Sequence, residues 1–167
     1  MLLVLASPLS ASDEEVIASA MSAAPQPVAQ HATIMAMEAD GTLRVVRQGD
    51  NQYTCIPDNP ATPGPDPMCA DTNAMEWIAA WVEHREPEAG QVGFMYMLAG
   101  GTDASNVDPW ATAPTESNHW IKTGPHVMVV GADSLLEIYP SGLDPDTSQP
   151  YVMWAGTPYA HLMIPVE

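Results

Sequence analysis

Basic side chains are scarce in this chain of 167 residues. Four Lys and Arg residues stand against 21 Asp and Glu residues, which gives a formal net charge of −17. Proteins bind nucleic-acid phosphates and anionic lipid surfaces through clustered basic side chains, and four scattered cations do not form such a cluster. The charge balance therefore indicates no nucleic-acid partner. The excess of acidic residues has two interpretations: the protein binds a metal ion or another cationic partner, or the negative charge keeps the protein soluble in a saline medium.

Long hydrophobic runs are also lacking. The apolar run 2–5 at the start of the chain is too short to span a bilayer, so we expect no integral membrane segment in the mature chain. Ser10-Ala11-Ser12 follows it with the small-residue pattern of a signal-peptidase site, although no Lys or Arg precedes the run. Residues 1–12 are thus predicted to be a signal peptide, whole or shortened at its start. Residues 13–167 are predicted to form a single globular domain that is periplasmic or secreted.

Cysteine occurs only twice, at Cys55 and Cys69. This spacing matches neither the zinc-site nor the redox C-x-x-C patterns. The segment between the two residues is rich in proline, and a cysteine pair that closes such a loop in an exported protein usually forms a disulfide. Closing a loop of this size stabilises the fold by ~3 kcal/mol in the chain-entropy model. We therefore predict a Cys55–Cys69 disulfide, which leaves no thiol for catalysis.

Hydrophobic periodicity and turn residues predict an α+β fold. The expected architecture is a mainly antiparallel sheet with one main packed helix, at about 72–84 and capped by Asp71, and with long ordered loops. Alternating strand–helix–strand units are absent, which argues against a doubly wound sheet. The loop 100–125 is expected to be packed, because it carries two tryptophans. Asp40-Gly41 is typical of a tight turn, so the strands expected at 32–37 and 42–47 should form a hairpin. The other expected elements are short helices at 13–21 and 133–138 and strands at 53–56, 92–99, 126–130, 151–154 and 160–164.

Two strand segments carry a His-x-Met pattern. These pairs are His126 with Met128 and His161 with Met163, and Met95 with Met97 repeats the spacing. Residues i and i+2 of a strand point to the same face, so each pair would present an imidazole beside a thioether. If the two strands are neighbours, the four side chains would converge on a site suited to copper, Cu(I) above all. The alternative is that the histidines are hydrogen-bonded structural residues and the methionines fill the core.

The loop after the 92–99 strand suggests two further sites. Oxygen ligands for a calcium ion could come from Asp103, Asn106 and Asp108. The pattern is not that of an EF-hand, because the glycine and the glutamate are misplaced. The alternative is that these residues form Asx turns, in which the side chains bind their own backbone. A hydrolase-like enzyme would use Asp103, Ser105 and His126, although the chain has no G-x-S-x-G nucleophile motif. A third alternative is a structural or interaction protein that presents aromatic residues of loops and strand ends. These residues are Trp110, Tyr151, Trp154 and Tyr159.

Five strings of the sequence are distinctive. They are Tyr53-Thr54-Cys55-Ile56-Pro57-Asp58, Pro63-Gly64-Pro65-Asp66-Pro67-Met68-Cys69, Gly100-Gly101-Thr102-Asp103-Ala104-Ser105-Asn106, Thr123-Gly124-Pro125-His126-Val127-Met128 and Gly156-Thr157-Pro158-Tyr159-Ala160-His161-Leu162-Met163. These strings resemble a group of small exported bacterial proteins that have no assigned activity. The resemblance covers about residues 51–166 and implies export and a bacterial source, but it implies no functional residues. Together with the two His-x-Met segments, the predicted export leads us to expect an exported cell-envelope binding protein. Its expected ligand is copper, or less favourably calcium, and its expected partner is a metal ion or an envelope component.

Overall fold

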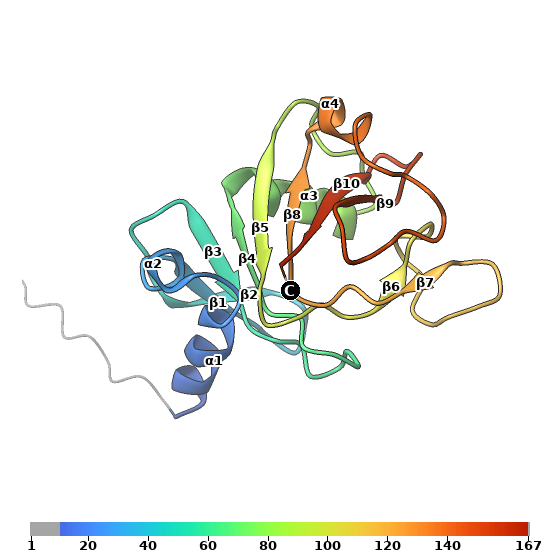
Figure 1. Cartoon of the computed structure of the whole chain (residues 1–167). Coiled ribbons are helices and arrows are strands. Elements are labelled where there is room, and N and C mark those ends of the chain that lie inside the picture. The colour runs from blue at the N-terminus through green and yellow to red at the C-terminus, as the bar shows by residue number, and fades with distance from the viewer. Residues whose placement is uncertain (1–10, 167) are drawn as a thin grey trace, which may run out of the picture.

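The structure is a computed structural model that describes residues 11–166 (Figure 1). Most of the predicted signal segment 1–12 lies outside these residues. The helices are α1 (Ala11–Met21), α2 (Gln26–Ala29), α3 (Thr72–Val82) and α4 (Asp133–Leu136). The strands are β1 (Thr33–Met37), β2 (Leu43–Arg47), β3 (Tyr53–Ile56), β4 (Met68–Asp71), β5 (Gly93–Met97), β6 (Ala104–Ser105), β7 (Trp120–Ile121), β8 (His126–Val130), β9 (Tyr151–Met153) and β10 (His161–Pro165).

Eight of the strands form one sheet in the order β2-β1-β3-β4-β5-β8-β10-β9, and β6 pairs separately with β7. Only the β1–β3 pairing is parallel, and the other pairings in the large sheet are antiparallel. The predicted α+β class with a mainly antiparallel sheet is therefore confirmed. The predicted hairpin around Asp40-Gly41 is β1–β2, in which Gly41 adopts a positive φ of 84°.

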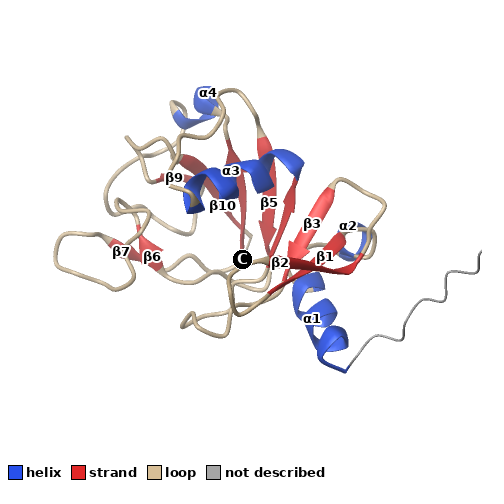
Figure 2. Cartoon of the chain, turned by 180° about the vertical axis from the view of Figure 1, so that it is seen from behind, coloured by secondary structure: helices blue, strands red, loops and turns tan. Residues whose placement is uncertain are grey.

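Helix α3 is the one main helix, and it lies across one face of the sheet (Figure 2). Asp71 caps it, because its Oδ1 accepts a hydrogen bond of 2.9 Å from the amide of Ala74. The helix ends at Val82, two residues earlier than predicted, because His84 takes a left-handed conformation with φ of 56°. Strand β5 approaches the helix so closely that a Cβ on Gly93 would collide with the backbone of Ala74. This contact explains the glycine at the start of β5.

The opposite face of the sheet carries two smaller cores. Helices α1 and α2 pack over β1 and β3 in a cluster that contains Ile34 and both cysteines. Val129 and Leu162, which alternate along their strands with Met128 and Met163, pack against α4 and the residues after it. Cys55 and Cys69 face each other across β3 and β4 and form the predicted disulfide, which is fully buried.

Two parts of the sheet structure were not predicted. Strand β4 is only four residues long and lies between the proline-rich loop and the cap of α3, so it shows no alternating pattern of its own. The predicted loop 100–125 is ordered as expected, but it also contains the two-residue strands β6 and β7. Within residues 11–166, no helix has the length and apolar character needed to cross a membrane.

Asp71 offers a test of this arrangement, because its second oxygen accepts a hydrogen bond of 2.9 Å from the amide of Phe94 in β5. Asp71→Ala removes the helix cap and a charge-assisted hydrogen bond in a buried place, and should lower the free energy of unfolding by about 3 kcal/mol. Asp71→Asn keeps one oxygen and should lose roughly half as much. Urea denaturation measures both, with the exposed Glu76→Ala on the same helix as the control. Equal stability of the Asp71→Ala variant and the wild type would contradict this role.

Candidate functional site

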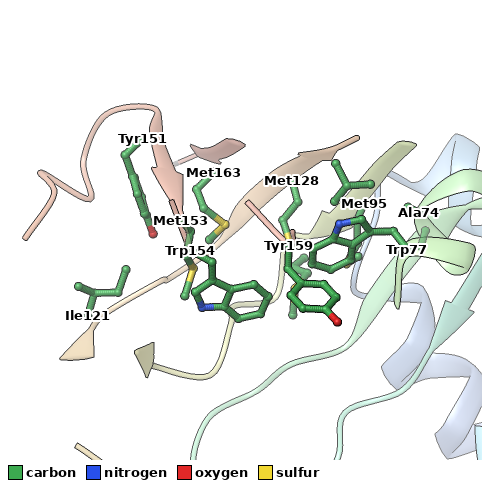
Figure 3. Packing of buried hydrophobic residues seen from close by; sticks show 13 residues of the cluster. Ala74, Trp77, Met95, Ile121, Met128, Tyr151, Met153, Trp154, Tyr159 and Met163 are labelled. Carbon is green, nitrogen blue, oxygen red and sulfur yellow. The ribbon is translucent and has the colours of Figure 1, made fainter. Parts of the chain in front are cut away.

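A row of sulfur-containing side chains crosses the face of the sheet that α3 covers. The strand register pairs Met95 with Met128 and Met128 with Met163, so the row spans β5, β8 and β10, and Tyr151 of β9 lies beside its end at Met163. Figure 3 shows the side chains of Met128 and Met163 on the same side of the sheet as Trp154. The two His-x-Met segments are therefore neighbouring strands, and their methionines face each other directly.

The histidines occupy opposite ends of this arrangement. His126 pairs with Met97 of β5 on one side and with Pro165 of β10 on the other. His161 pairs with Met153 of β9. Because β8 and β10 are antiparallel, Met128 and Met163 lie between the two imidazoles. About four residues of strand, roughly 13 Å at 3.3 Å per residue, separate the Cα positions of the two histidines along the strand direction.

This face of the sheet forms the floor of a cavity of about 570 Å³. The proline-rich cysteine loop, α3, and the segment from Gly101 to Thr112 form its walls. All five tryptophans of the protein, six of its methionines and two of its histidines line the cavity. These residues are Trp77, Trp81, Trp110, Trp120, Trp154, Met68, Met95, Met97, Met128, Met153, Met163, His126 and His161.

Three of the five indole rings form a contiguous aromatic wall. Trp77 and Trp154 stack with ring centroids 6.1 Å apart and planes 8° apart, and Trp81 lies 5.6 Å from Trp154. The His161 ring meets both Trp77 and Trp154 edge-on, at 5.3 and 4.9 Å. Trp154 itself is fixed by a hydrogen bond of 2.8 Å from its Nε1 to the carbonyl of Ser105. The wall is therefore rigid on the side where His161 lies.

Both histidines are oriented by backbone carbonyls. Nδ1 of His126 donates to the oxygen of Gly124 at 2.7 Å, and Nδ1 of His161 donates to the oxygen of Tyr159 at 2.9 Å. A carbonyl oxygen only accepts hydrogen bonds, so Nδ1 carries the proton and Nε2 of each neutral ring keeps a free lone pair. Among residues 11–166, neither Nε2 atom has a hydrogen-bond partner.

Burial keeps both rings neutral. It lowers the pKa of His161 to about 4, and it also lowers the pKa of His126. The hydrogen bonds to the carbonyls of Tyr159 and Gly124 oppose this effect but do not overcome it. At neutral pH the floor of the cavity thus offers two hydrogen-bond acceptors and no positive charge.

Two carboxylates complete the polar lining of the cavity. Asp66 comes from the cysteine loop, and its Oδ1 accepts a hydrogen bond of 2.9 Å from the amide of Asn59. Burial raises the pKa of the half-buried Asp66 carboxyl, and the nearby Asp58 adds to this effect. Asp103 comes from the segment before β6 and is also half-buried. The cavity therefore combines an apolar body with a small number of acidic and neutral acceptor groups.

The structure places the predicted calcium-loop residues against different partners. Asp103 lines the cavity, whereas Nδ2 of Asn106 donates to the carbonyls of Gly142 and Leu143. Asp108 is exposed, and its Oδ1 accepts from the amide of Trp110. Within the part of the chain that the structure describes, no three His, Cys, Asp or Glu side chains are arranged to hold a metal ion.

The hydrolase-like set is not assembled either. Ser105 is buried, and its hydroxyl donates to the carbonyl of Asn118 at 2.6 Å while it accepts from the amides of Val107 and Asp108. These bonds give Ser105 a structural role in the turn after β6. In residues 11–166, no hydrogen bond joins Ser105 to His126 or to Asp103.

The convergence of the tryptophans was not predicted. They come from α3, from the loop after β6, from β7 and from the end of β9, and no spacing in the sequence links these segments. Of the aromatic residues considered for an exposed interaction surface, Tyr151, Trp154 and Tyr159 are buried, and only Trp110 is exposed.

Comparison of the chain with protein-family models, with curated proteins and with solved structures finds no match.

The buried His161 predicts a pH dependence of stability. The unfolded chain takes up a proton near the usual histidine pKa of about 6.5, whereas the folded protein does so only near a pKa of about 4. Between these values the unfolded state binds more protons, so stability falls as the pH falls through this window. His161→Asn keeps an amide donor for the carbonyl of Tyr159 but does not titrate. Relative to that variant, the wild type should lose on the order of 3 kcal/mol between pH 7 and pH 4.

Urea denaturation at pH 7, 5.5 and 4 measures this difference. The exposed His31→Asn is the matched control and should follow the wild type. If the stabilities of the wild type and His161→Asn change in parallel with pH, His161 is not the titrating group.

Proposed function

We propose that this protein binds a small, mainly apolar molecule in the cavity over β5, β8, β10 and β9. The observation that carries the proposal is a volume of about 570 Å³ lined mainly by indole rings and thioethers, with few polar groups among them. Ligand pockets in proteins are typically 300–1,000 Å³ in volume and combine apolar walls with a few oriented polar groups. The aromatic wall and the two fixed imidazoles have this composition.

Binding fits the arrangement better than catalysis does. The hydroxyl of the predicted catalytic set, that of Ser105, is used in the turn after β6. The two histidines are held by carbonyls rather than by a carboxylate. Burial lowers the pKa of both rings, whereas a general base works best when its pKa lies near the operating pH. They are placed to accept hydrogen bonds from a ligand.

The neutral probe 4-phenylbutan-1-ol tests the proposal. At about 0.5 kcal/mol per heavy atom, we expect a Kd on the order of 100 μM. Because every tryptophan lines the cavity, the probe should change the intrinsic tryptophan fluorescence, and calorimetry should give one site per chain. Ala104→Phe fills part of the cavity and should weaken binding at least tenfold, whereas Ala89→Phe places the same ring on the exposed surface. Ala111→Phe repeats the test at a second lining position. Equal affinity of all four proteins, or no saturable binding, would refute the proposal.

Cu(I) is a second candidate ligand, which the two histidines and the facing methionines favour. A metal-binding histidine commonly donates its other ring N–H to a backbone carbonyl, as both His126 and His161 do. Thioethers and imidazoles are ligands that suit Cu(I). Because metal–nitrogen bonds are about 2 Å long and the histidines lie at opposite ends of the row, the register favours an ion held by Met128 and Met163 with one histidine.

Copper analysis after anaerobic loading with Cu(I) tests this candidate. The wild type should retain about one copper per chain against a competing chelator. Met128→Leu combined with Met163→Leu keeps the core volume and should lower retention at least tenfold, and the exposed Met37→Leu is the control. The pair His126→Ala with His161→Ala should also lower retention. Unchanged copper content in either double variant would remove the candidate.

A periplasmic or secreted location remains part of the proposal. The buried Cys55–Cys69 disulfide supports it, because disulfides form and persist in oxidising compartments. The signal-like pattern of residues 1–12 supports the same location.

A further inference from the structure

The carboxylates that line the cavity face no positively charged side chain within it. Its lining contains the carboxylates of Asp66 and Asp103 but no Lys or Arg side chain. Lys122 lies in sequence between the lining residues Trp120 and Thr123, but its side chain is exposed and is not part of the lining. Arg85 is also exposed and is paired with Glu83 at 2.6 Å. An anionic ligand would therefore meet carboxylates and no counter-charge.

The hydrogen-bond donors of the lining are largely used within the protein. Three hydroxyls and three indole N–H groups of the lining each donate to a backbone carbonyl. These groups belong to Thr62, Thr102, Thr123, Trp81, Trp110 and Trp154. The ring N–H groups of both histidines are used in the same way. Few donors are thus left to hold a carboxylate or a phosphate.

The acceptors, in contrast, are left open. Nε2 of His126 and Nε2 of His161 are unprotonated and without partners among residues 11–166. Asp66 and Asp103 add carboxylate oxygens to the same cavity. The faces of the indole rings attract cations through their quadrupoles, by about 0.5–2 kcal/mol for each well-placed contact.

We propose that the natural occupant of the cavity is a hydrophobic amine that is protonated at neutral pH and carries N–H donors. This inference rests on the proposed binding function and names the class of ligand. The apolar body of the amine lies against the methionine floor and the indole wall. Its ammonium group donates hydrogen bonds to a neutral imidazole Nε2 and to the carboxylate of Asp66 or Asp103.

Three probes with the same phenylbutyl body test the charge preference. They are 4-phenylbutylamine, 4-phenylbutan-1-ol and 4-phenylbutanoate, measured by calorimetry at pH 7.5 in 0.3 M NaCl, where salt screens the net charge of the protein. The amine should bind at least tenfold more tightly than the alcohol, and the carboxylate more weakly than the alcohol. Binding of the alcohol with no preference for the amine overturns this inference and leaves the proposed function standing. If none of the three binds, the proposed function itself fails.

Variants separate the cavity carboxylates from the overall negative charge. Asp66→Asn combined with Asp103→Asn should reduce the preference for the amine at least fivefold and leave the affinity for the alcohol unchanged. The exposed pair Asp40→Asn with Asp133→Asn removes the same charge elsewhere and should leave the preference unchanged. An equal loss of preference in both double variants would show that attraction comes from net charge and would overturn the assignment.

A fourth probe tests the hydrogen bonds to the imidazoles. The quaternary 4-phenylbutyl-trimethylammonium ion keeps the positive charge but has no N–H donor, and it should bind at least threefold more weakly than the primary amine. Affinity of the quaternary ion equal to or above that of the amine would overturn the hydrogen bonds proposed from the ammonium group to the imidazole and carboxylate acceptors.

Discussion

The antiparallel pairing of β8 with β5 and β10 is the constraint on which the candidate site depends. It places Met128 between Met95 and Met163, and it puts His126 and His161 on the same face. A shift of one residue in either pairing would turn the thioethers and imidazoles of that strand to the other face. The register is held because Val129 and Leu162 must be buried against α4 on that other face. Packing on one face of the sheet thus fixes the strand register that the other face requires.

The cavity above this face exists because bulky side chains are fixed at its walls and do not collapse into it. Nε1 of Trp154 donates a hydrogen bond to the carbonyl of Ser105, and Nε1 of Trp81 donates one to the carbonyl of Pro109. Residues 105–109 therefore hold these two indoles in place. The buried side chain of Asn106 holds that loop to residues 142–143. A methionine floor adapts readily to ligands of different shape, because the thioether side chain is flexible and polarizable. The site therefore combines a rigid wall with a deformable floor.

Charge acts on two scales in this protein. The large excess of acidic residues gives the whole molecule a negative field that attracts cations over a distance. Inside the cavity, burial keeps the two imidazoles neutral, and the hydrogen bonds to Gly124 and Tyr159 leave their acceptor atoms open. Both the net charge of the protein and the lining of the cavity disfavour anions, and both are consistent with a ligand that carries positive charge.

The sequence by itself determined the features that depend on neighbours along the chain. These include the Asp71 cap, the Asp40-Gly41 hairpin, the two-residue period that puts each histidine beside its methionine, and the Cys55–Cys69 pairing. Only the tertiary structure decided that the methionines face each other with the histidines at opposite ends. It also decided that Ser105 is a turn residue and that five tryptophans meet over one cavity. These outcomes arise from strand register and from packing between distant segments, where many alternatives satisfy the same local pattern and the buried contacts select one of them.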